Sequence, residues 1–97
     1  MDSKTRAYLK GLAMKIQPTT QVGKNGITQN VLAQIDEVLE ARELVKITVF
    51  KNSDIACKDI INELAQQLQA EPVQFIGNKI VLYRFSKKDD VRHILDF

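Results

Sequence analysis

Two hydrophobic periods alternate along the chain, and their order constrains the fold more than any other feature of the sequence. Three segments repeat apolar residues at the 3.6-residue period of an amphipathic helix. Four shorter segments are rich in β-branched residues or alternate apolar and polar side chains, as strands do. This order predicts a single compact α/β domain of the form αβαβαββ, with a four-stranded mixed sheet covered by helices. The predicted helices are residues 3–17, 28–42 and 55–70, and the predicted strands are residues 19–22, 44–50, 73–76 and 80–85.

The ends of these segments carry start and stop signals. Pro18 ends the first helix, and Thr28 is placed to cap the second. Residues 52–54, Asn-Ser-Asp, provide turn and capping chemistry before the third helix, and Pro72 prevents its continuation. Residues 77–79, Gly-Asn-Lys, form a short connection of the kind that closes a β-hairpin, so we expect the domain to end with one.

Length and composition favour one domain. The chain has 97 residues, of which 44% are hydrophobic and 27% charged, values that exclude the disordered class. No linker, low-complexity run or internal repeat divides it, so residues 1–86 are expected to form the domain and residues 87–97 a C-terminal tail. The sequence leaves open whether Val91, Ile94 and Leu95 make this tail a short docking helix.

Several classes of protein do not fit the sequence. The single cysteine, Cys57, cannot form an internal disulfide, and no Cys/His cluster is present to hold zinc. The charged residues 1–6 are not followed by an apolar run long enough for a signal peptide or a membrane span. We therefore expect a cytoplasmic protein with no metal and no membrane partner.

Few residues could catalyse a reaction. The only histidine, His93, lies 36 residues from Cys57, and no pattern brings the two together. Asp36 and Glu40 are spaced to share one helix face, but acidic residues on an amphipathic helix are usually its solvent-exposed face. We therefore expect no catalytic residues, no cofactor and no small-molecule substrate.

The charge is distributed unevenly, although the net charge is only +2. Residues 1–28 contain five basic residues against one acidic residue, a net charge of +4. Residues 29–45 contain four acidic residues against one basic residue, a net charge of −3. One face should therefore be basic and another acidic. The basic residues of the first segment are Lys4, Arg6, Lys10, Lys15 and Lys24.

The segment Gly23-Lys24-Asn25-Gly26 joins a predicted strand to the helix capped at Thr28. It is not a nucleotide-binding P-loop, which needs four residues between its glycines and a Lys-Ser/Thr after the second. Its glycines permit positive φ and leave room for an approaching backbone, and the free N–H groups of the following helix favour an anion. KH domains clamp the RNA backbone with a GxxG loop, and residues 23–26 could act in the same way. The alternative for this segment is a plain glycine turn.

Two aromatic residues are candidates for base stacking. Tyr8 and Phe50 fall outside the apolar faces of their segments, whereas Phe75 and Tyr83 are expected to pack in the core. Arg84 shares its strand parity with apolar residues, so either that strand is buried on both faces or Arg84 reaches out at its end.

Three motifs in order resemble the CRM domain family, named for chloroplast RNA splicing and ribosome maturation, in its stand-alone bacterial, YhbY-like form. Residues 9–13, Leu-Lys-Gly-Leu-Ala, with Pro18 resemble the first helix of that family and its exit. Residues 23–28, Gly-Lys-Asn-Gly-Ile-Thr, resemble its GxxG loop, and residues 76–84, Ile-Gly-Asn-Lys-Ile-Val-Leu-Tyr-Arg, its terminal hairpin. The resemblance covers about residues 3–86 and implies the same αβαβαββ order.

The resemblance also implies a function, namely binding of structured ribosomal RNA in precursors of the large (50S) subunit. A protein-interaction module that docks through the second helix or the tail is the alternative, and a monomer is the default. Many relatives continue with a proline and a basic tail, which this chain lacks, so no RNA contact is assigned to its tail. The residues implied as RNA contacts are Gly23, Lys24, Asn25 and Gly26, with Lys10 on an adjoining helix surface; Thr28, Lys4, Arg6 and Lys15 are added from capping and charge.

Overall fold

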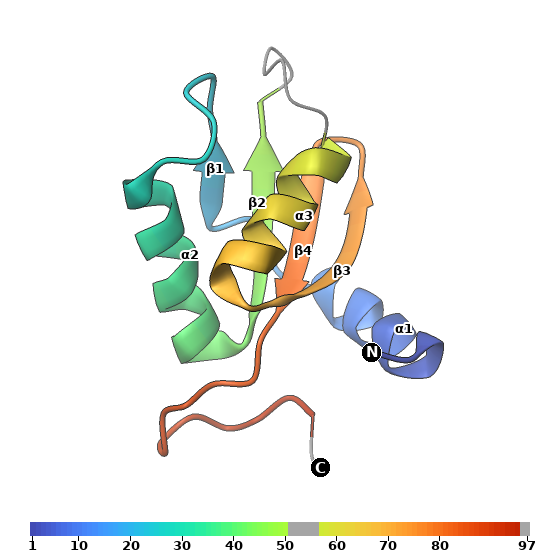
Figure 1. Ribbon diagram of the computed structural model, residues 1–97. Coiled ribbons are helices and arrows are strands. Elements are labelled where there is room, and N and C mark those ends of the chain that lie inside the picture. Colours follow the sequence, from blue (N-terminus) through green and yellow to red (C-terminus); the bar gives the residue numbers. More distant parts are fainter. Residues whose placement is uncertain (51–56, 96–97) are drawn as a thin grey trace.

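The computed structural model describes residues 1–50 and 57–95. Its helices and strands follow the predicted order and form a single compact α/β domain (Figure 1). The elements are α1 (Ser3–Ala13), β1 (Thr20–Val22), α2 (Gln29–Arg42), β2 (Leu44–Val49), α3 (Cys57–Leu68), β3 (Glu71–Ile76) and β4 (Lys79–Tyr83).

The four strands form one mixed sheet in the order β1, β2, β4, β3. β1 and β2 are parallel, and the pairs β2–β4 and β3–β4 are antiparallel. The predicted hairpin is present, but its connection is two residues long, Gly77 and Asn78, and Lys79 begins β4. Gly77 has a φ of 59°, in the left-handed region that glycine adopts without a steric penalty.

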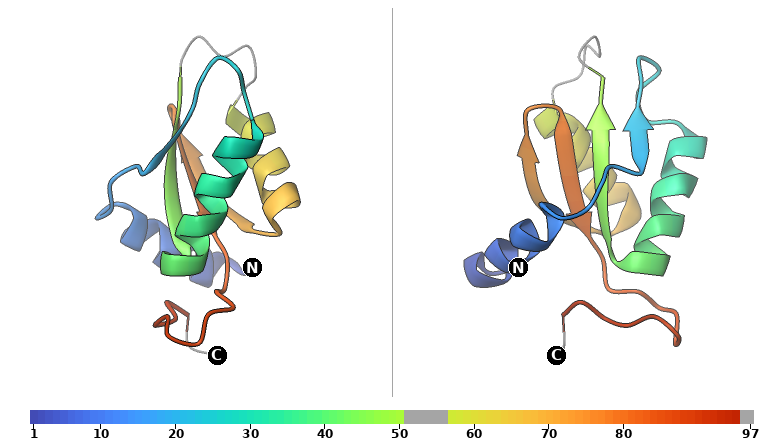
Figure 2. Two further views of the ribbon diagram at one scale, coloured as in Figure 1. Left: turned by 90° about the vertical axis from the view of Figure 1, so that its left-hand side faces the viewer. Right: turned by 180° about the vertical axis from the view of Figure 1, so that it is seen from behind.

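Helices cover the two faces of the sheet unequally. α2 and α3 pack on one face and enclose the larger core, which includes Ile35, Ile47 and Leu64. α1 lies on the other face, across the lower end of the sheet, over a smaller core around Leu9 (Figures 1 and 2). No described helix covers the upper part of that face. We call this part the open sheet face; it carries the paired side chains of Gln21, Thr48 and Lys79, and the exposed Ile76 beyond Lys79 on β3.

The alternation predicted for β2 accounts for the difference between the two faces. Val45, Ile47 and Val49 point into the core beneath α2 and α3, as expected. Lys46 and Thr48 point to the opposite face and are only half-buried. β4 is buried on both faces. This decides between the two alternatives for Arg84: its parity with apolar residues reflects a strand buried on both faces, which Arg84 directly follows.

α1 ends at Ala13, four residues before the predicted limit at Gln17. The N–H groups of Lys15 and Ile16 donate to carbonyls three residues earlier in the chain, instead of the four-residue spacing of an α-helix. Lys46 Nζ also donates to the Ala13 carbonyl at 3.2 Å, the acceptor that the next helical turn would use. The helix therefore ends on a tertiary contact with β2, before Pro18 is reached.

α2 begins as the sequence predicts. Thr28 Oγ1 accepts a hydrogen bond from the Val31 N–H at 3.2 Å and caps the helix. The capping role predicted for residues 52–54 before α3 lies outside the described residues.

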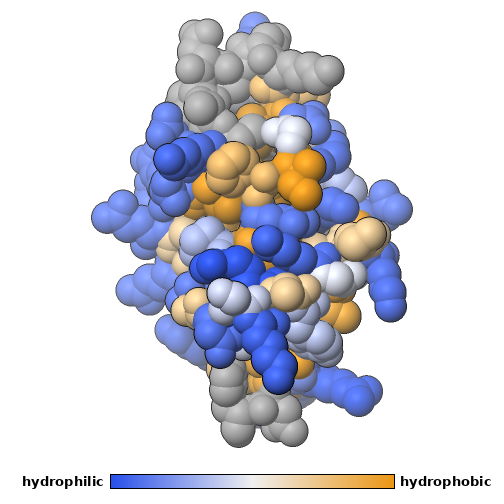
Figure 3. All heavy atoms as spheres, turned by 90° about the vertical axis from the view of Figure 1, so that its right-hand side faces the viewer, coloured by the Kyte–Doolittle hydropathy of each residue, from blue (hydrophilic) through white to orange (hydrophobic). Residues whose placement is uncertain are grey.

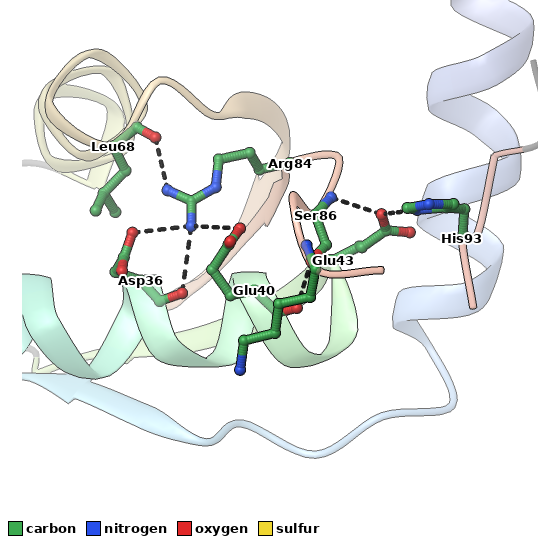
Figure 4. A network of polar contacts seen from close by, with 8 residues as sticks. Asp36, Glu40, Glu43, Leu68, Arg84, Ser86 and His93 are labelled. Atoms are coloured by element: carbon green, nitrogen blue, oxygen red, sulfur yellow. Dashed lines mark hydrogen bonds and ion pairs between the residues drawn. The ribbon is translucent and has the colours of Figure 1, made fainter. Parts of the chain in front are cut away.

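Arg84 joins three elements at the lower end of the molecule (Figure 4). Its guanidinium donates to the Leu68 carbonyl at 2.9 Å, at the end of α3. It also pairs with Asp36 at 2.8 Å and with Glu40 at 3.2 Å, both on α2. Asp36 is exposed, as expected, whereas Glu40 is half-buried. The sequence interpretation missed that both are paired, because their cation lies 44 to 48 residues away in the sequence.

Glu43 holds the C-terminal tail against the domain. Its side chain is fully buried and accepts hydrogen bonds from the N–H groups of Ser86, at 2.6 Å, and Ile94, at 2.7 Å. His93 Nδ1 lies 2.6 Å from the same carboxylate, and the His93 ring stacks on Phe85 with the centroids 3.9 Å apart (Figure 4). One buried carboxylate thus binds Ser86, directly before the tail, and His93 and Ile94 within it.

The described tail docks without forming a helix. Ile94 and Leu95 pack on the smaller core beside Leu9. No helix occurs between Arg84 and Leu95, which excludes the docking helix for these residues. The Glu43 carboxylate takes up the Ile94 N–H, a group that a helix would have used for its own backbone.

Glu43 makes the stability of the domain depend on pH. Burial alone would raise the pKa of this carboxyl, but the hydrogen bonds from Ser86, His93 and Ile94 outweigh burial and hold the pKa below the ordinary value of 4.5. Its contribution is therefore complete above that value and is lost as the pH falls through the lowered pKa. Glu43→Gln should lower the free energy of unfolding at neutral pH by about 2–3 kcal/mol and weaken its dependence on acid, both measurable by urea unfolding across a pH series.

The matched control is Glu37→Gln, at an exposed position of the same helix. This variant should unfold like the wild type at every pH. Equal behaviour of the two variants would contradict the role assigned to Glu43.

Candidate nucleic-acid interface

The glycine loop, residues 23–26, lies at the upper end of the sheet between β1 and α2 (Figure 1). It is a tight turn in which the Gly26 N–H donates to the Gly23 carbonyl at 2.9 Å. Gly26 is buried and has a φ of 72°, so the turn requires glycine there. Lys24 and Asn25 form the exposed tip, where a ligand could reach them.

Gly23 has a different role from Gly26. Its φ is outside the left-handed region, and a Cβ at this position would lie 3.7 Å from Phe50 Cδ2, an ordinary contact. The Phe50 N–H donates to the Val22 carbonyl at 3.0 Å, which fixes the half-exposed Phe50 beside the loop. The fold therefore tolerates a side chain at position 23, and glycine there keeps the backbone open to approach.

The first turn of α2 offers backbone donors to an anion. Thr28 satisfies the Val31 N–H, whereas the N–H groups of Gln29 and Asn30 have no hydrogen-bond partner among the described residues. The positive end of the helix dipole and the nearby Lys24 ammonium both favour negative charge at this place. Thr28 thus acts as a cap that shapes the site.

The basic residues of the first helix do not adjoin the loop. Lys4 and Lys10 are exposed on α1, Arg6 is half-buried there, and Lys15 is exposed just after the helix. α1 crosses the lower end of the sheet, whereas the loop lies at its upper end (Figure 2). The basic surface of α1, which we expected next to the glycine loop, is therefore separated from the loop by the open sheet face.

Two lysines that sequence reasoning missed lie between these parts. Gln21 is paired with Thr48, and Thr48 with Lys79, so their side chains form a row across three strands. Lys79 Nζ donates to Thr48 Oγ1 at 3.1 Å. Lys46 lies on the same face, two residues before Thr48. Alternation in β2 could have identified Lys46, but only the strand order places Lys79 beside it.

The aromatic residues follow the sequence interpretation with one exception. Tyr8 and Phe50 are exposed and Tyr83 is buried, as expected. Phe75 is 47% exposed, so its assignment to the core is wrong. It lies on the edge strand β3, which has a neighbour on one side only and an irregular register near Pro72. Figure 3 faces this edge and shows apolar side chains gathered in its upper part, with mostly hydrophilic and scattered apolar side chains below them.

Metal ligands are not grouped among the described residues, and the segments that carry Cys57 and His93 lie far apart. The described residues contain no group of three or more His, Cys, Asp or Glu residues that could hold a metal ion. α3, which begins with Cys57, starts at the upper end of the molecule, whereas the tail with His93 crosses the lower end (Figure 1). None of the described helices has the length and apolar character needed to cross a membrane.

The sequence matches the CRS1 / YhbY (CRM) domain over residues 1–84. The chain belongs to this family. It is 39% identical over 89 residues to the Probable RNA-binding protein YqeI of Bacillus subtilis, an alignment that covers 92% of this chain and 93% of YqeI. It is 36% identical over 92 residues to an RNA-binding protein of Haemophilus influenzae, covering 95% of this chain and 93% of that protein.

A solved structure has the same fold. The solution structure of the protein SAV1595 from Staphylococcus aureus superposes with a TM-score of 0.79 and is 41% identical, covering 93% of this chain and 94% of that chain. The CRM domain is an RNA-binding domain, and the two relatives are named as RNA-binding proteins. The family supports RNA as the partner of this CRM domain. The residues from Phe85 onward, including the tail, lie beyond the matched residues.

The two loop glycines should respond differently to substitution. Gly26→Ala places a side chain at positive φ and should lower the free energy of unfolding by about 1–2 kcal/mol. Gly23→Ala should change it by less than about 0.5 kcal/mol, because its Cβ meets only an ordinary contact. Thermal unfolding of both variants measures the difference; equal losses would show that the loop geometry is not as described.

Proposed function

We propose that this protein is a non-enzymatic RNA-binding factor that acts in the cytoplasm, as a monomer, in assembly of the large ribosomal subunit. The observation that carries RNA contact is the turn at residues 23–26 directly before the open first turn of α2. Membership of the CRM family and the names of the relatives support RNA as the partner. The ribosomal role rests on the resemblance of a stand-alone CRM domain to family members that bind precursors of the 50S subunit.

The proposed contacts at the loop combine three physical effects. Gly23 leaves the backbone accessible, Lys24 supplies a full positive charge, and Asn25 can donate or accept a hydrogen bond. Gly26 and Thr28 hold the turn and the helix end in place. Phosphate contacts of this kind supply most of the affinity, and the shape of the RNA supplies most of the selectivity.

The second part of the proposed footprint is the basic surface of the first helix. It consists of Lys4, Arg6 and Lys10, with Lys15 beyond the helix end. Because the open sheet face separates this surface from the loop, one RNA molecule that contacts both must pass across the sheet (Figure 2).

Lys24→Ala should weaken binding to a structured ribosomal RNA fragment and make its salt dependence shallower. One lost phosphate contact should reduce the slope of log K against log salt by about 0.7–1. Lys88→Ala removes an equal charge from an exposed position in the tail and should leave the slope unchanged. An unchanged slope for Lys24→Ala would remove this residue from the footprint.

Sedimentation of a cell lysate tests the ribosomal role against the protein-interaction alternative. The protein should sediment with precursors of the large subunit, and nuclease treatment should release it. Sedimentation with a protein complex that survives nuclease treatment would instead favour docking through α2 or the tail.

A further inference from the structure

A pocket of about 290 Å³ lies at the lower end of the sheet, on the side of β1 and β2. It is enclosed by the end of α1 and the residues that follow it, the last turns of α2, the start of β2 and the C-terminal tail. We call it the basic pocket. Its volume is near the lower limit for sites that enclose small organic ligands, so it suits one ring system rather than a large molecule.

The pocket has an apolar interior and a polar opening. Leu12, Ile16, Leu44 and Ile94 contribute aliphatic walls. Gln17 and Thr19 add side chains that can donate and accept hydrogen bonds. Apolar walls with a few hydrogen-bonding groups suit a flat heterocycle, whose faces are apolar and whose edge is polar.

Three cations surround the pocket without an acidic counterpart. Lys15, Arg42 and Lys46 line it, and none of the described lining residues is Asp or Glu. Lys15 and Arg42 are exposed and form no ion pair or side-chain hydrogen bond with a described residue. Lys46 is half-buried, and its Nζ has only a neutral partner, the Ala13 carbonyl at 3.2 Å. A phosphate beside the heterocycle would complement this charge.

The tail forms one wall of the pocket in a defined position. Ile94 donates its N–H to the buried Glu43 carboxylate at 2.7 Å, and the neighbouring His93 contacts the same carboxylate. Thr19, another lining residue, is held in place because its N–H donates to the Lys46 carbonyl at 3.0 Å. The pocket is therefore built from fixed backbone in two segments.

β1 connects the basic pocket directly with the glycine loop. Thr19 lines the pocket and Gly23 begins the loop, four residues along an extended chain, a span of roughly 13 Å. Gln21 and Thr48, which lie between them, are on the open sheet face, where no described helix obstructs a ligand (Figure 2). A few nucleotides of one strand could cover this distance.

We propose that the basic pocket receives one unpaired base of the RNA strand whose backbone lies on the glycine loop, with an adjacent phosphate held by Lys15, Arg42 and Lys46. This inference rests on the proposed RNA-binding function and adds a preference for RNA with an unpaired segment. Recognition of single-stranded RNA generally uses such splayed bases, including stacking on an arginine guanidinium. Arg42 lies in the acidic segment, residues 29–45, and the count of charges gave it no role. The proposal makes it part of the RNA site.

The test compares two RNAs with four forms of the full chain. The RNAs are a hairpin with a six-nucleotide single-stranded extension and the same hairpin without it, and 2-aminopurine replaces each extension position in turn. The wild type should bind the extended hairpin about tenfold more tightly, and one probe position should change its fluorescence strongly. Arg42→Gln should abolish the preference and the fluorescence change, while leaving binding to the plain hairpin within about twofold, because Arg42 has no place in the rest of the footprint.

The control is Lys88→Gln, which removes the same charge from an exposed tail position and should retain both effects. Lys24→Ala should weaken binding to both hairpins alike. The inference is overturned if the wild type binds both hairpins equally, if no probe position responds, or if the pocket variant keeps the preference. Failure to bind either RNA would instead overturn the proposed function itself.

Discussion

The buried carboxylate of Glu43 organises the lower end of this molecule. A charge removed from water is tolerated only when hydrogen bonds replace its hydration. Among the described residues, the partners of this side chain are Ser86, directly before the tail, and His93 and Ile94 in the tail. The backbone carbonyl of Glu43 accepts the N–H of Arg84, so β4 is tied to the same residue. The end of α2, the exit of β4 and the tail therefore hold their positions together, and the wall that Ile94 gives to the basic pocket depends on them.

The unequal covering of the sheet gives the molecule two different sides. α2 and α3 bury one face almost completely, which supplies the larger core. α1 covers only the lower end of the other face, so the strands leave polar and basic side chains between the helix and the glycine loop (Figure 2). This arrangement places the glycine loop, the open sheet face and the basic pocket along the edge strand β1. The proposed RNA path follows from that order in space.

The parts of the site that sequence reasoning found are those that depend on neighbouring residues. The turn at Gly23–Gly26 and the cap at Thr28 involve bonds that span three residues, so their chemistry is visible in a short segment. The parts that it missed depend on contacts between distant segments. Lys79 lies on the open sheet face because it is paired with Thr48. Arg42 lines the basic pocket because α1, β2 and the tail, which come from distant parts of the sequence, form the other walls of that pocket. No period or motif records such contacts.

The sequence by itself determined the order of the elements, the alternation of β2, the capped start of α2 and the position of the glycine loop, because hydrophobic period and local backbone chemistry act over a few residues. Tertiary structure decided where α1 ends, which acidic residues are paired or buried, and how the tail docks. Each of these depends on a partner from another element: Lys46 for the Ala13 carbonyl, Arg84 for Asp36, and Ser86 for Glu43. Local periodicity cannot identify a partner more than thirty residues away. Features that depend on such distant partners are therefore decided only when the chain folds.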